Sequence, residues 1–168
     1  MIEIRAGAPS DVAFVIACIR ALAEFEKLLE HFHATEDALA RHLFGAEPSC
    51  ELLVAELDGE RSGYALFFTT YSTFLTRPGI FLEDLFVVAD ARGKGLGKAL
   101  LVELARLAVH RECGRVEWSV LDWNRRAIEF YDSLGARPVT GWIPYRLEGD
   151  RLSELAATGS MGVRPFRS

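Results

Sequence analysis

The most constraining feature of this chain is a run of glycines between an apolar segment and a periodic one. Residues 86–101 read FVVADARGKGLGKALL, in which Gly93, Gly95 and Gly97 are two residues apart. From Leu96 to Leu107, leucines recur at steps of three and four residues, which predicts an amphipathic helix. An apolar strand that passes through glycines into a helix is typical of α/β folds, so we expect a sheet with helices packed against it.

This helix start is suited to an anion. The first turn of a helix has unpaired backbone N–H groups and the positive end of the helix dipole. Glycines let the backbone approach a ligand, while Arg92, Lys94 and Lys98 add positive charge. A phosphate or pyrophosphate is the expected ligand; the alternative is a glycine-rich turn that binds nothing. Two known phosphate loops do not fit, because a Walker loop needs Ser or Thr where Ala99 stands and a dinucleotide fingerprint needs glycine in place of Lys98.

The remaining pattern predicts one α/β unit over residues 1–156 and a loose tail over residues 157–168. Asp58-Gly59 predicts a hairpin turn, and Thr35 is expected to cap a helix that ends near Gly45. The expected order is a strand (2–6), a helix after residues 9–11, the helix after Thr35, two hairpin strands, a strand (80–88), the helix after the glycines, a strand (115–121), a helix (124–135) and one or two strands. This order predicts a mixed sheet.

The charge of the chain disfavours some partners. The 19 Lys and Arg residues against 24 Asp and Glu give a net charge of −5, which suits a small cationic amine rather than nucleic acid. The beginning of the sequence has no targeting pattern, and no apolar run reaches the roughly 18 residues of a membrane span. Cys18, Cys50 and Cys113 are too scattered for a disulfide framework or a zinc site, so we expect a cytoplasmic protein.

A second block, residues 124–136, reads NRRAIEFYDSLGA. Asn124, Ala127, Tyr131 and Gly135 follow one another at steps of three, four and four residues, which puts them on one helix face. Asn124 is suited to cap the helix, Ala127 leaves space beside a ligand, and Tyr131 projects a phenol. The alternative is an amphipathic helix that packs Ile128 and Tyr131 into the core.

With its Arg-x-x-Gly-x-Gly loop after the strand LEDLFVV and this second block, the chain resembles the GCN5-related N-acetyltransferase (GNAT) superfamily. The resemblance extends from IEIRAGAPSD through RALAEFEKL to GWIPYRL. Within the superfamily the chain is similar to the diamine branch, which comprises the spermidine/spermine and thialysine acetyltransferases. It implies a mostly antiparallel mixed sheet with helices on both faces. It also implies acetyl-CoA as the acetyl donor and a homodimer in which residues 141–152 offer a strand for pairing or exchange.

The resemblance also implies site residues. Glu83 is implied as the base acting through water or as a substrate carboxylate, and Tyr131 as the acid that faces the cofactor sulfur. The expected acetyl-CoA contacts are Leu85, Phe86, Val87, Arg92, Gly93, Lys94, Gly95, Leu96, Gly97, Lys98, Asn124, Arg125, Arg126 and Ala127. The expected substrate contacts are Phe25, Glu26, Glu83, Glu117, Trp118 and Ser119. Two departures are that Phe25 replaces the tyrosine expected in the polyamine enzymes, and that the loop 137–141 looks shortened and lacks an expected acidic residue.

Residue chemistry supports acetyl transfer independently. Attack on a thioester requires a neutral amine, and an alkyl amine with a pKa near ~10 is mostly protonated at pH 7, so a base is needed. On a regular strand Glu83 and Asp84 point to opposite faces, so only one of them can serve the site. The Tyr131 hydroxyl can supply a proton to the leaving thiolate, and a strand N–H, that of Phe86, is expected to meet the oxyanion.

Three functions remain open from the sequence. The first is transfer to a small amine, the second is the same chemistry on a protein lysine or N-terminus, and the third is an acetyl-CoA sensor without turnover. The pairing of an acid and a base argues against the sensor. His31 and His33 lack further residues at metal-ligand spacing, so we expect no metal. No cysteine has a recognisable His partner, so direct transfer is preferred over a cysteine intermediate.

Overall fold

The structure, a computed structural model, describes residues 1–158 and divides the chain into two units, residues 1–121 and residues 122–168. The first unit contains the sheet and the helices α1–α3, and the second contains α4 and α5. Of the tail expected at residues 157–168, residues 159–168 lie outside the described residues. No helix among residues 1–158 is long and apolar enough to cross a membrane.

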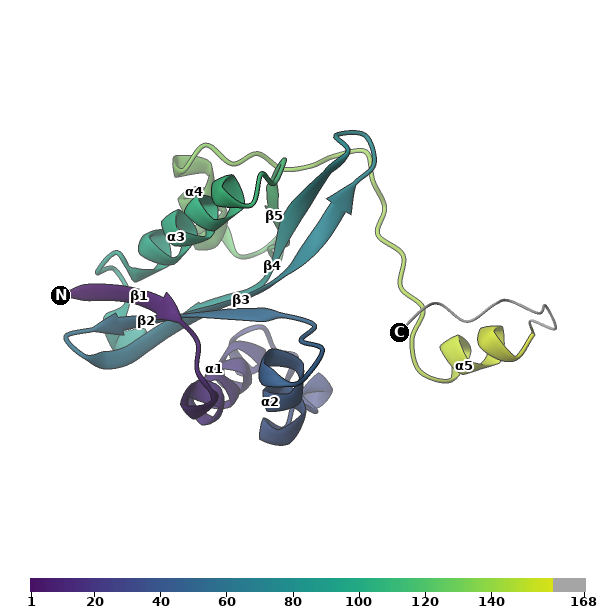
Figure 1. Ribbon diagram of the computed structural model, residues 1–168, viewed down its shortest axis with the longest axis horizontal. Helices are drawn as coiled ribbons and strands as arrows, with labels where there is room; N and C mark the ends of the chain where they lie inside the picture. The colour runs from purple at the N-terminus through teal and green to yellow at the C-terminus, as the bar shows by residue number, and fades with distance from the viewer. Residues whose placement is uncertain (159–168) are drawn as a thin grey trace. The chain divides into compact units, whose positions relative to one another are not determined.

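The first unit is built on a five-stranded sheet in the order β1-β2-β3-β4-β5 (Figure 1). Its strands are β1 (Ile2–Ala6), β2 (Glu51–Leu57), β3 (Glu60–Ser72), β4 (Arg77–Val87) and β5 (Val116–Trp118). The first four pair antiparallel and β5 pairs parallel to β4, which confirms the expected mixed, mostly antiparallel sheet. The predicted hairpin turn joins β2 to β3, with positive φ at both Asp58 and Gly59.

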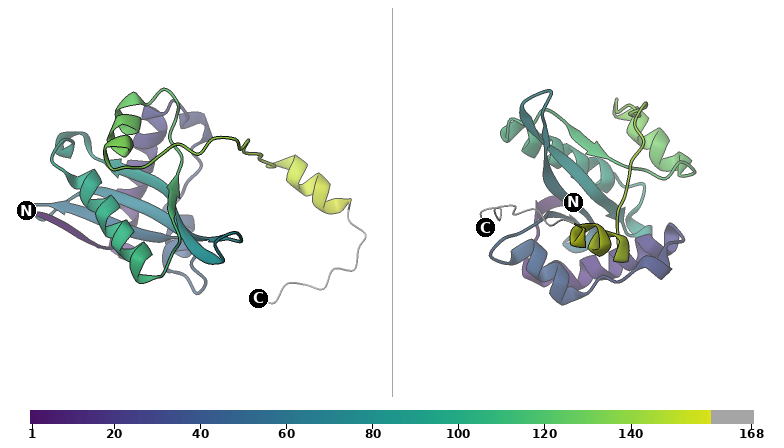
Figure 2. Two further views of the ribbon diagram at one scale, coloured as in Figure 1. Left: turned by 90° about the horizontal axis from the view of Figure 1, so that it is seen from above. Right: turned by 90° about the vertical axis from the view of Figure 1, so that its right-hand side faces the viewer.

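Helices cover both faces of this sheet, as expected. Helices α1 (Val12–Phe25) and α2 (Glu36–Phe44) lie on one face and α3 (Leu96–His110) lies on the other (Figures 1 and 2). Short 3₁₀ turns occupy Pro9–Asp11, Leu29–His31 and Ala89–Ala91. The predicted cap of α2 is confirmed, because the Thr35 hydroxyl accepts the N–H of Ala38 at 3.3 Å.

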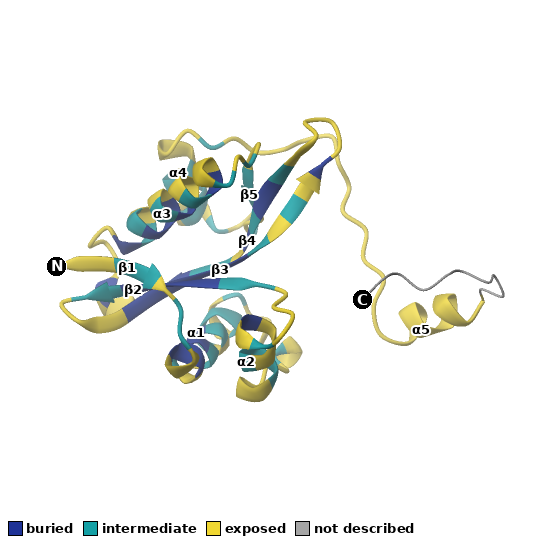
Figure 3. Ribbon diagram, in the orientation of Figure 1, coloured by how far each residue is buried: buried dark blue, intermediate teal, exposed yellow. Residues whose placement is uncertain are grey.

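The core consists of two apolar layers on either side of the sheet. Figure 3 shows the buried residues along the middle strands and on the sides of the helices that face them. Leu96, Leu100 and Leu104 of α3 are almost completely buried, which confirms the helix face expected from the leucine spacing. On the other face, Val15 of α1 packs in a cluster with Val54 and Tyr64 of the sheet.

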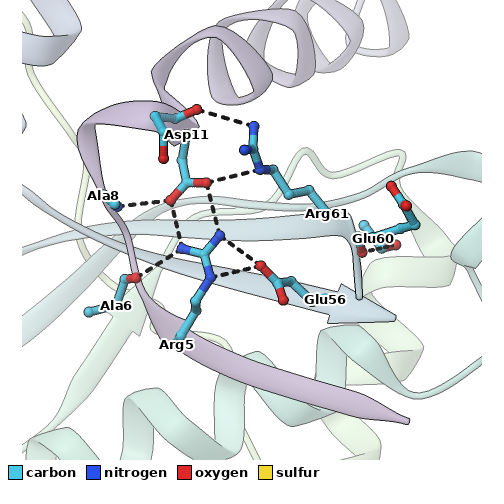
Figure 4. A network of polar contacts seen from close by, with 9 residues as sticks. Arg5, Ala6, Ala8, Asp11, Glu56, Glu60 and Arg61 are labelled. Atoms are coloured by element: carbon cyan, nitrogen blue, oxygen red, sulfur yellow. Dashed lines mark hydrogen bonds and ion pairs between the residues drawn. The ribbon is translucent and has the colours of Figure 1, made fainter. Parts of the chain in front are cut away.

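A network of ion pairs around one buried carboxylate fixes the start of α1 to the sheet (Figure 4). The fully buried Asp11 carboxylate accepts two hydrogen bonds from Arg5 of β1, at 2.7 and 2.9 Å, and one from the N–H of Ala8 at 2.8 Å. Arg61 of β3 pairs with the same carboxylate at 3.1 Å, and Glu56 pairs with Arg5. The hydrogen bonds from Arg5 lower the pKa of Asp11, so the buried carboxylate is ionised and its charge is compensated.

The second unit contains α4 (Arg125–Ser133) and α5 (Asp150–Ala157). The predicted cap of α4 is confirmed, because Asn124 Oδ1 accepts the N–H of Ala127 at 3.3 Å. The one or two strands expected after α4 were predicted wrongly, since residues 122–158 contain no strand. Pro138 and Pro144 have no N–H to donate to a ladder, and residues 150–152 begin α5 instead of ending a strand.

Candidate active site

The pairing of β4 with β3 is interrupted at Glu83 by a β-bulge. Leu66 of β3 pairs with Asp84 and Phe67 pairs with Leu82, so Glu83 is an additional residue on β4. Bulges break the strict alternation of side chains along a strand and redirect them. The prediction that Glu83 and Asp84 point to opposite faces assumed regular alternation, and the bulge removes that basis. Glu83 is exposed, whereas Asp84 is half-buried.

Beyond the bulge, the edge of β4 that faces β5 is open. The ladder between these strands consists of the pairs Ile80–Val116, Phe81–Glu117 and Leu82–Trp118. Within residues 1–121, no strand pairs with residues 83–87 on this side. An extended ligand can therefore use backbone hydrogen-bonding groups of β4 here, and the predicted contacts Leu85, Phe86 and Val87 lie on this stretch.

The glycine-rich loop connects this open edge to α3. Gly95 precedes the first helical residue with φ of 94°, and Gly93 has φ of 77°, both in the left-handed region that favours glycine. A Cβ on Gly93 would meet nothing within 4 Å, so the backbone is open to a ligand. No side chain caps α3, which leaves the first N–H groups of the helix available. The loop thus has the geometry of the expected anion site.

Arg92 folds back onto the end of β4. Its Nε donates to the carbonyl oxygen of Val87 at 2.9 Å, and its guanidinium lies 5.5 Å from the centre of the Phe86 ring. The Arg92 side chain therefore holds the glycine-rich loop against β4 and places its positive charge at the end of that strand. Sequence reasoning predicted the charge but not this structural role.

A pocket of about 240 Å³ lies on the side of the sheet covered by α1. Its polar wall includes two carboxylates, Glu26 just after α1 and Asp84 on β4. The other lining residues are Ile19, Leu22, Ala23, Leu28, His31, Phe32, His33 and Ala34. We call this the acidic pocket. A larger groove of about 500 Å³ lies between β1 and α3, and of the predicted site residues only Gly95 and Lys98 line it. Two of its three charged lining residues, Lys98 and Arg106, are basic. The acidic pocket is therefore the better site for an amine.

Electrostatics in the acidic pocket favour a cation. Burial raises the pKa of Glu26, and the charge of Asp84 raises it further. Burial also raises the pKa of Asp84; a hydrogen bond from Tyr64 opposes this shift, and the charge of Glu83 adds to it. Crowded carboxylates that have lost solvent are stabilised by a cation between them, so the pocket can bind an ammonium group.

Asp84 of the acidic pocket and Tyr64, which donates a hydrogen bond to Asp84 from behind the pocket, were not among the predicted site residues. Of the adjacent carboxylates Glu83 and Asp84, the family resemblance implies only Glu83 as a site residue. Tyr64 was hidden in the apolar segment GYALFFTTYS, where a tyrosine resembles a core aromatic residue. The signal that could have identified Tyr64 is its hydroxyl, because a tyrosine in a buried strand needs a hydrogen-bond partner.

The other predicted substrate residues of the first unit lie on α1 and around β5. Phe25 ends α1 next to Glu26 and is about half exposed. Trp118 is the last residue of β5, and Ser119 follows it. The Glu117 carboxylate is paired at 2.6 Å with Arg115, which directly precedes β5, so its charge is already compensated.

The second unit carries the remaining predicted residues on α4. Asn124 caps the helix, and Arg125, Arg126 and Ala127 form its first turn. Tyr131 lies further along the same helix, with its ring centre 5.4 Å from that of Phe130. Burial raises the pKa of Tyr131, so its phenol carries a proton at neutral pH and can act as a proton donor.

Cys18, which is buried in α1, is poorly suited to act as a nucleophile. Burial raises the pKa of Cys18 to about 11, which disfavours a thiolate nucleophile at neutral pH. Within residues 1–158 no group of three or more His, Cys, Asp or Glu side chains is arranged to hold a metal ion.

Comparison with known proteins finds one matching family and several similar proteins. The acetyltransferase (GNAT) family matches residues 18–136. Thialysine N-epsilon-acetyltransferase of Mus musculus is 38% identical over 165 residues, covering 92% of this chain and 96% of that protein. L-ornithine N5-acetyltransferase of Arabidopsis thaliana is 33% identical, covering 91% and 87%. Among solved structures, an integron cassette protein from V. cholerae superposes with a TM-score of 0.76 at 27% identity, covering 92% of this chain and 97% of the other.

Proposed function

The chain belongs to the acetyltransferase (GNAT) family and is an N-acetyltransferase, and we propose that it transfers the acetyl group of acetyl-CoA to a primary amine of a small cationic substrate. The proposed route is direct attack by the amine while both substrates are bound. The observation that carries the substrate class is the acidic pocket, in which Glu26 and Asp84 offer two partly buried carboxylates to a cation.

A basic amino acid or a diamine is the substrate class we propose. The two relatives described above are named for transfer to the Nε of thialysine and to the N5 of L-ornithine. A substrate of this kind carries a side-chain amine that is cationic when it arrives at the pocket. The volume of about 240 Å³ and the carboxylates Glu26 and Asp84 suit such a chain.

The glycine-rich loop fits the pyrophosphate of acetyl-CoA. Gly93 and Gly95 keep the backbone free of Cβ atoms, and the uncapped first turn of α3 offers N–H groups to an anion. Lys94 and Lys98 add positive charge, and residues 85–87 offer backbone groups to an extended arm. When bound, acetyl-CoA supplies an activated acetyl thioester.

Two side chains are proposed to handle the protons. Glu83 accepts a proton from the amine through water, which leaves the nitrogen lone pair free to attack. Tyr131 donates its phenolic proton to the departing sulfur, a role supported by the burial that keeps the phenol protonated. The N–H of Phe86 was expected to meet the oxyanion, but Phe86 pairs with Tyr64 and its N–H points to β3, as does that of Val88, which donates to Ser62 of β3 at 2.9 Å. The N–H of Leu85, on the open edge of β4, is proposed instead to stabilise negative charge on the carbonyl oxygen.

The direct test is to incubate the protein with acetyl-CoA and a panel of amines while following the release of free thiol. We expect the highest kcat/KM with thialysine, L-ornithine or a diamine. A higher kcat/KM with a lysine peptide or a protein N-terminus would favour a protein acetyltransferase. Binding of acetyl-CoA without turnover of any amine would favour a sensor.

Replacement of Gly95 by Asp tests the pyrophosphate site. The variant places a negative charge at the start of α3 and puts a side chain at φ of 94°, so we expect acetyl-CoA affinity to fall at least ~10-fold. Isothermal titration calorimetry measures this, with Gly141→Asp as control because Gly141 has a similar φ of 87° outside the proposed site. A folded Gly95→Asp variant with unchanged affinity would refute the site.

A homodimer is a further part of the proposal. Trp142, Ile143 and Tyr145 are 75%, 78% and 93% exposed, and such apolar side chains on a soluble chain mark an interaction surface. Since residues 150–157 are helical, the segment proposed to pair or exchange between subunits is reduced to residues 141–149. Light scattering at micromolar concentration is expected to give the mass of a dimer for the wild-type protein. The Ile143→Asp variant is expected to give a lower mass. A monomer mass for the wild-type protein would contradict the proposal.

A further inference from the structure

We propose that Tyr64 is a positioning residue for amine binding, whose buried hydroxyl holds the Asp84 carboxylate in the acidic pocket as an anion. The inference rests on the proposed function for its amine substrate, and it extends the site to a residue in the core of the sheet. Tyr64 does not line the acidic pocket and is expected to act only through Asp84.

The contact is well defined. Tyr64 lies on β3, is completely buried, and donates its hydroxyl hydrogen to Oδ2 of Asp84 at 3.0 Å. Its ring belongs to a core cluster with Val15, Val54 and Phe86, and its centre is 6.3 Å from that of Phe86. A ring enclosed in this way has little freedom to turn, so the position of its hydroxyl is fixed by the packing.

The bulge explains why Asp84 needs such a partner. Tyr64 pairs with Phe86, which puts Asp84 two residues away along β4, within reach of the phenol. Asp84 directly follows Glu83, the additional residue of the bulge, where regular pairing is lost. The hydrogen bond from β3 therefore fixes a side chain that the local ladder holds less firmly.

Several titratable groups surround Asp84, and the two neighbouring glutamates disfavour its charge. Glu83 precedes it on β4, Glu26 faces it from the end of α1, and His31 and His33 line the same pocket. Burial and the charge of Glu83 raise the pKa of Asp84, whereas the Tyr64 hydrogen bond lowers it. Cys18 of α1 lies near Tyr64, and burial raises the pKa of both, so the phenol stays protonated and remains a donor.

Tyr64→Phe removes the hydroxyl and keeps the ring. We expect KM for thialysine to rise about tenfold at pH 7 while kcat changes by less than about threefold, because the loss affects an anion that binds the substrate. The pKa of Asp84 should rise, so the acidic limb of the kcat/KM profile should move to higher pH. Tyr71→Phe is the matched control, since Tyr71 lies on the same strand with 60% exposure.

A double-mutant cycle separates positioning from general loss of stability. Asp84→Asn should raise KM by itself, and adding Tyr64→Phe to it should change KM no further, because the two residues act through one contact. If the effects of the two substitutions on KM simply add, or if Tyr64→Phe alone leaves KM and the pH profile unchanged, the inference is wrong.

A measurement without substrate distinguishes this inference from the proposed function. Carbon-13 NMR titration of the Asp84 carboxyl should give a higher pKa in Tyr64→Phe than in the wild-type protein and in Tyr71→Phe. An unchanged pKa would overturn the inference even in an active enzyme. If the pKa of Asp84 is raised in Tyr64→Phe but the wild-type protein acetylates no amine, the positioning of Asp84 by Tyr64 is supported and the proposed function is overturned instead.

Discussion

Tyr131→Phe is expected to lower kcat by ~10²–10⁴-fold while leaving the fold and the affinity for acetyl-CoA unchanged. The substitution keeps the aromatic ring next to Phe130 and removes the proton that we propose goes to the leaving sulfur. Burial raises the pKa of Tyr131, so the wild-type phenol is protonated across the neutral range. The measurement is kcat at saturating acetyl-CoA with one good amine substrate.

Tyr145→Phe is the matched control for Tyr131→Phe. Tyr145 is also in the second unit but is 93% exposed, so losing its hydroxyl should leave kcat unchanged. The comparison has to be made where chemistry limits the rate, because slow product release would hide the effect. If Tyr131→Phe then keeps more than about a third of wild-type turnover, Tyr131 is a packing residue and the acid role is wrong.

Glu83→Gln is expected to lower kcat/KM by ~10²–10⁴-fold at pH 7 and to recover activity as the pH rises. The amide keeps the shape of the side chain and cannot accept the proton of the amine. An alkyl amine with a pKa near ~10 becomes neutral without help at high pH, so the need for a base disappears. Tyr131→Phe should show no such recovery, which separates the two roles in one set of pH–rate profiles.

The bulge makes Asp84→Asn the informative comparison for Glu83→Gln. Because regular alternation does not assign one carboxylate to the site, Asp84 is the other candidate for the base. We expect Asp84→Asn mainly to raise KM, and Glu60→Gln, on an exposed end of β3, to behave like the wild-type protein. Rescue by high pH in Asp84→Asn but not in Glu83→Gln would transfer the base role to Asp84.

Local signals in the sequence were sufficient for most of the fold. Thr35 and Asn124 cap the helices that they were expected to cap, and Asp58-Gly59 forms the predicted turn. The positive φ of Gly95 and the buried leucines of α3 also follow from residue type and spacing. Each of these features depends on interactions within a few residues, and such interactions can be inferred from the order of the chain.

Tertiary structure alone decided the details of the pocket. The bulge at Glu83, the bond from Tyr64 to Asp84 and the approach of Glu26 to Asp84 depend on how distant segments pair and pack. A shift of one residue in the pairing of β3 with β4 would change which side chains face the pocket, and no local pattern in the sequence encodes that register. The sequence by itself therefore determined the α/β architecture and the glycine-rich loop before α3, whereas long-range register and packing decided which carboxylates meet.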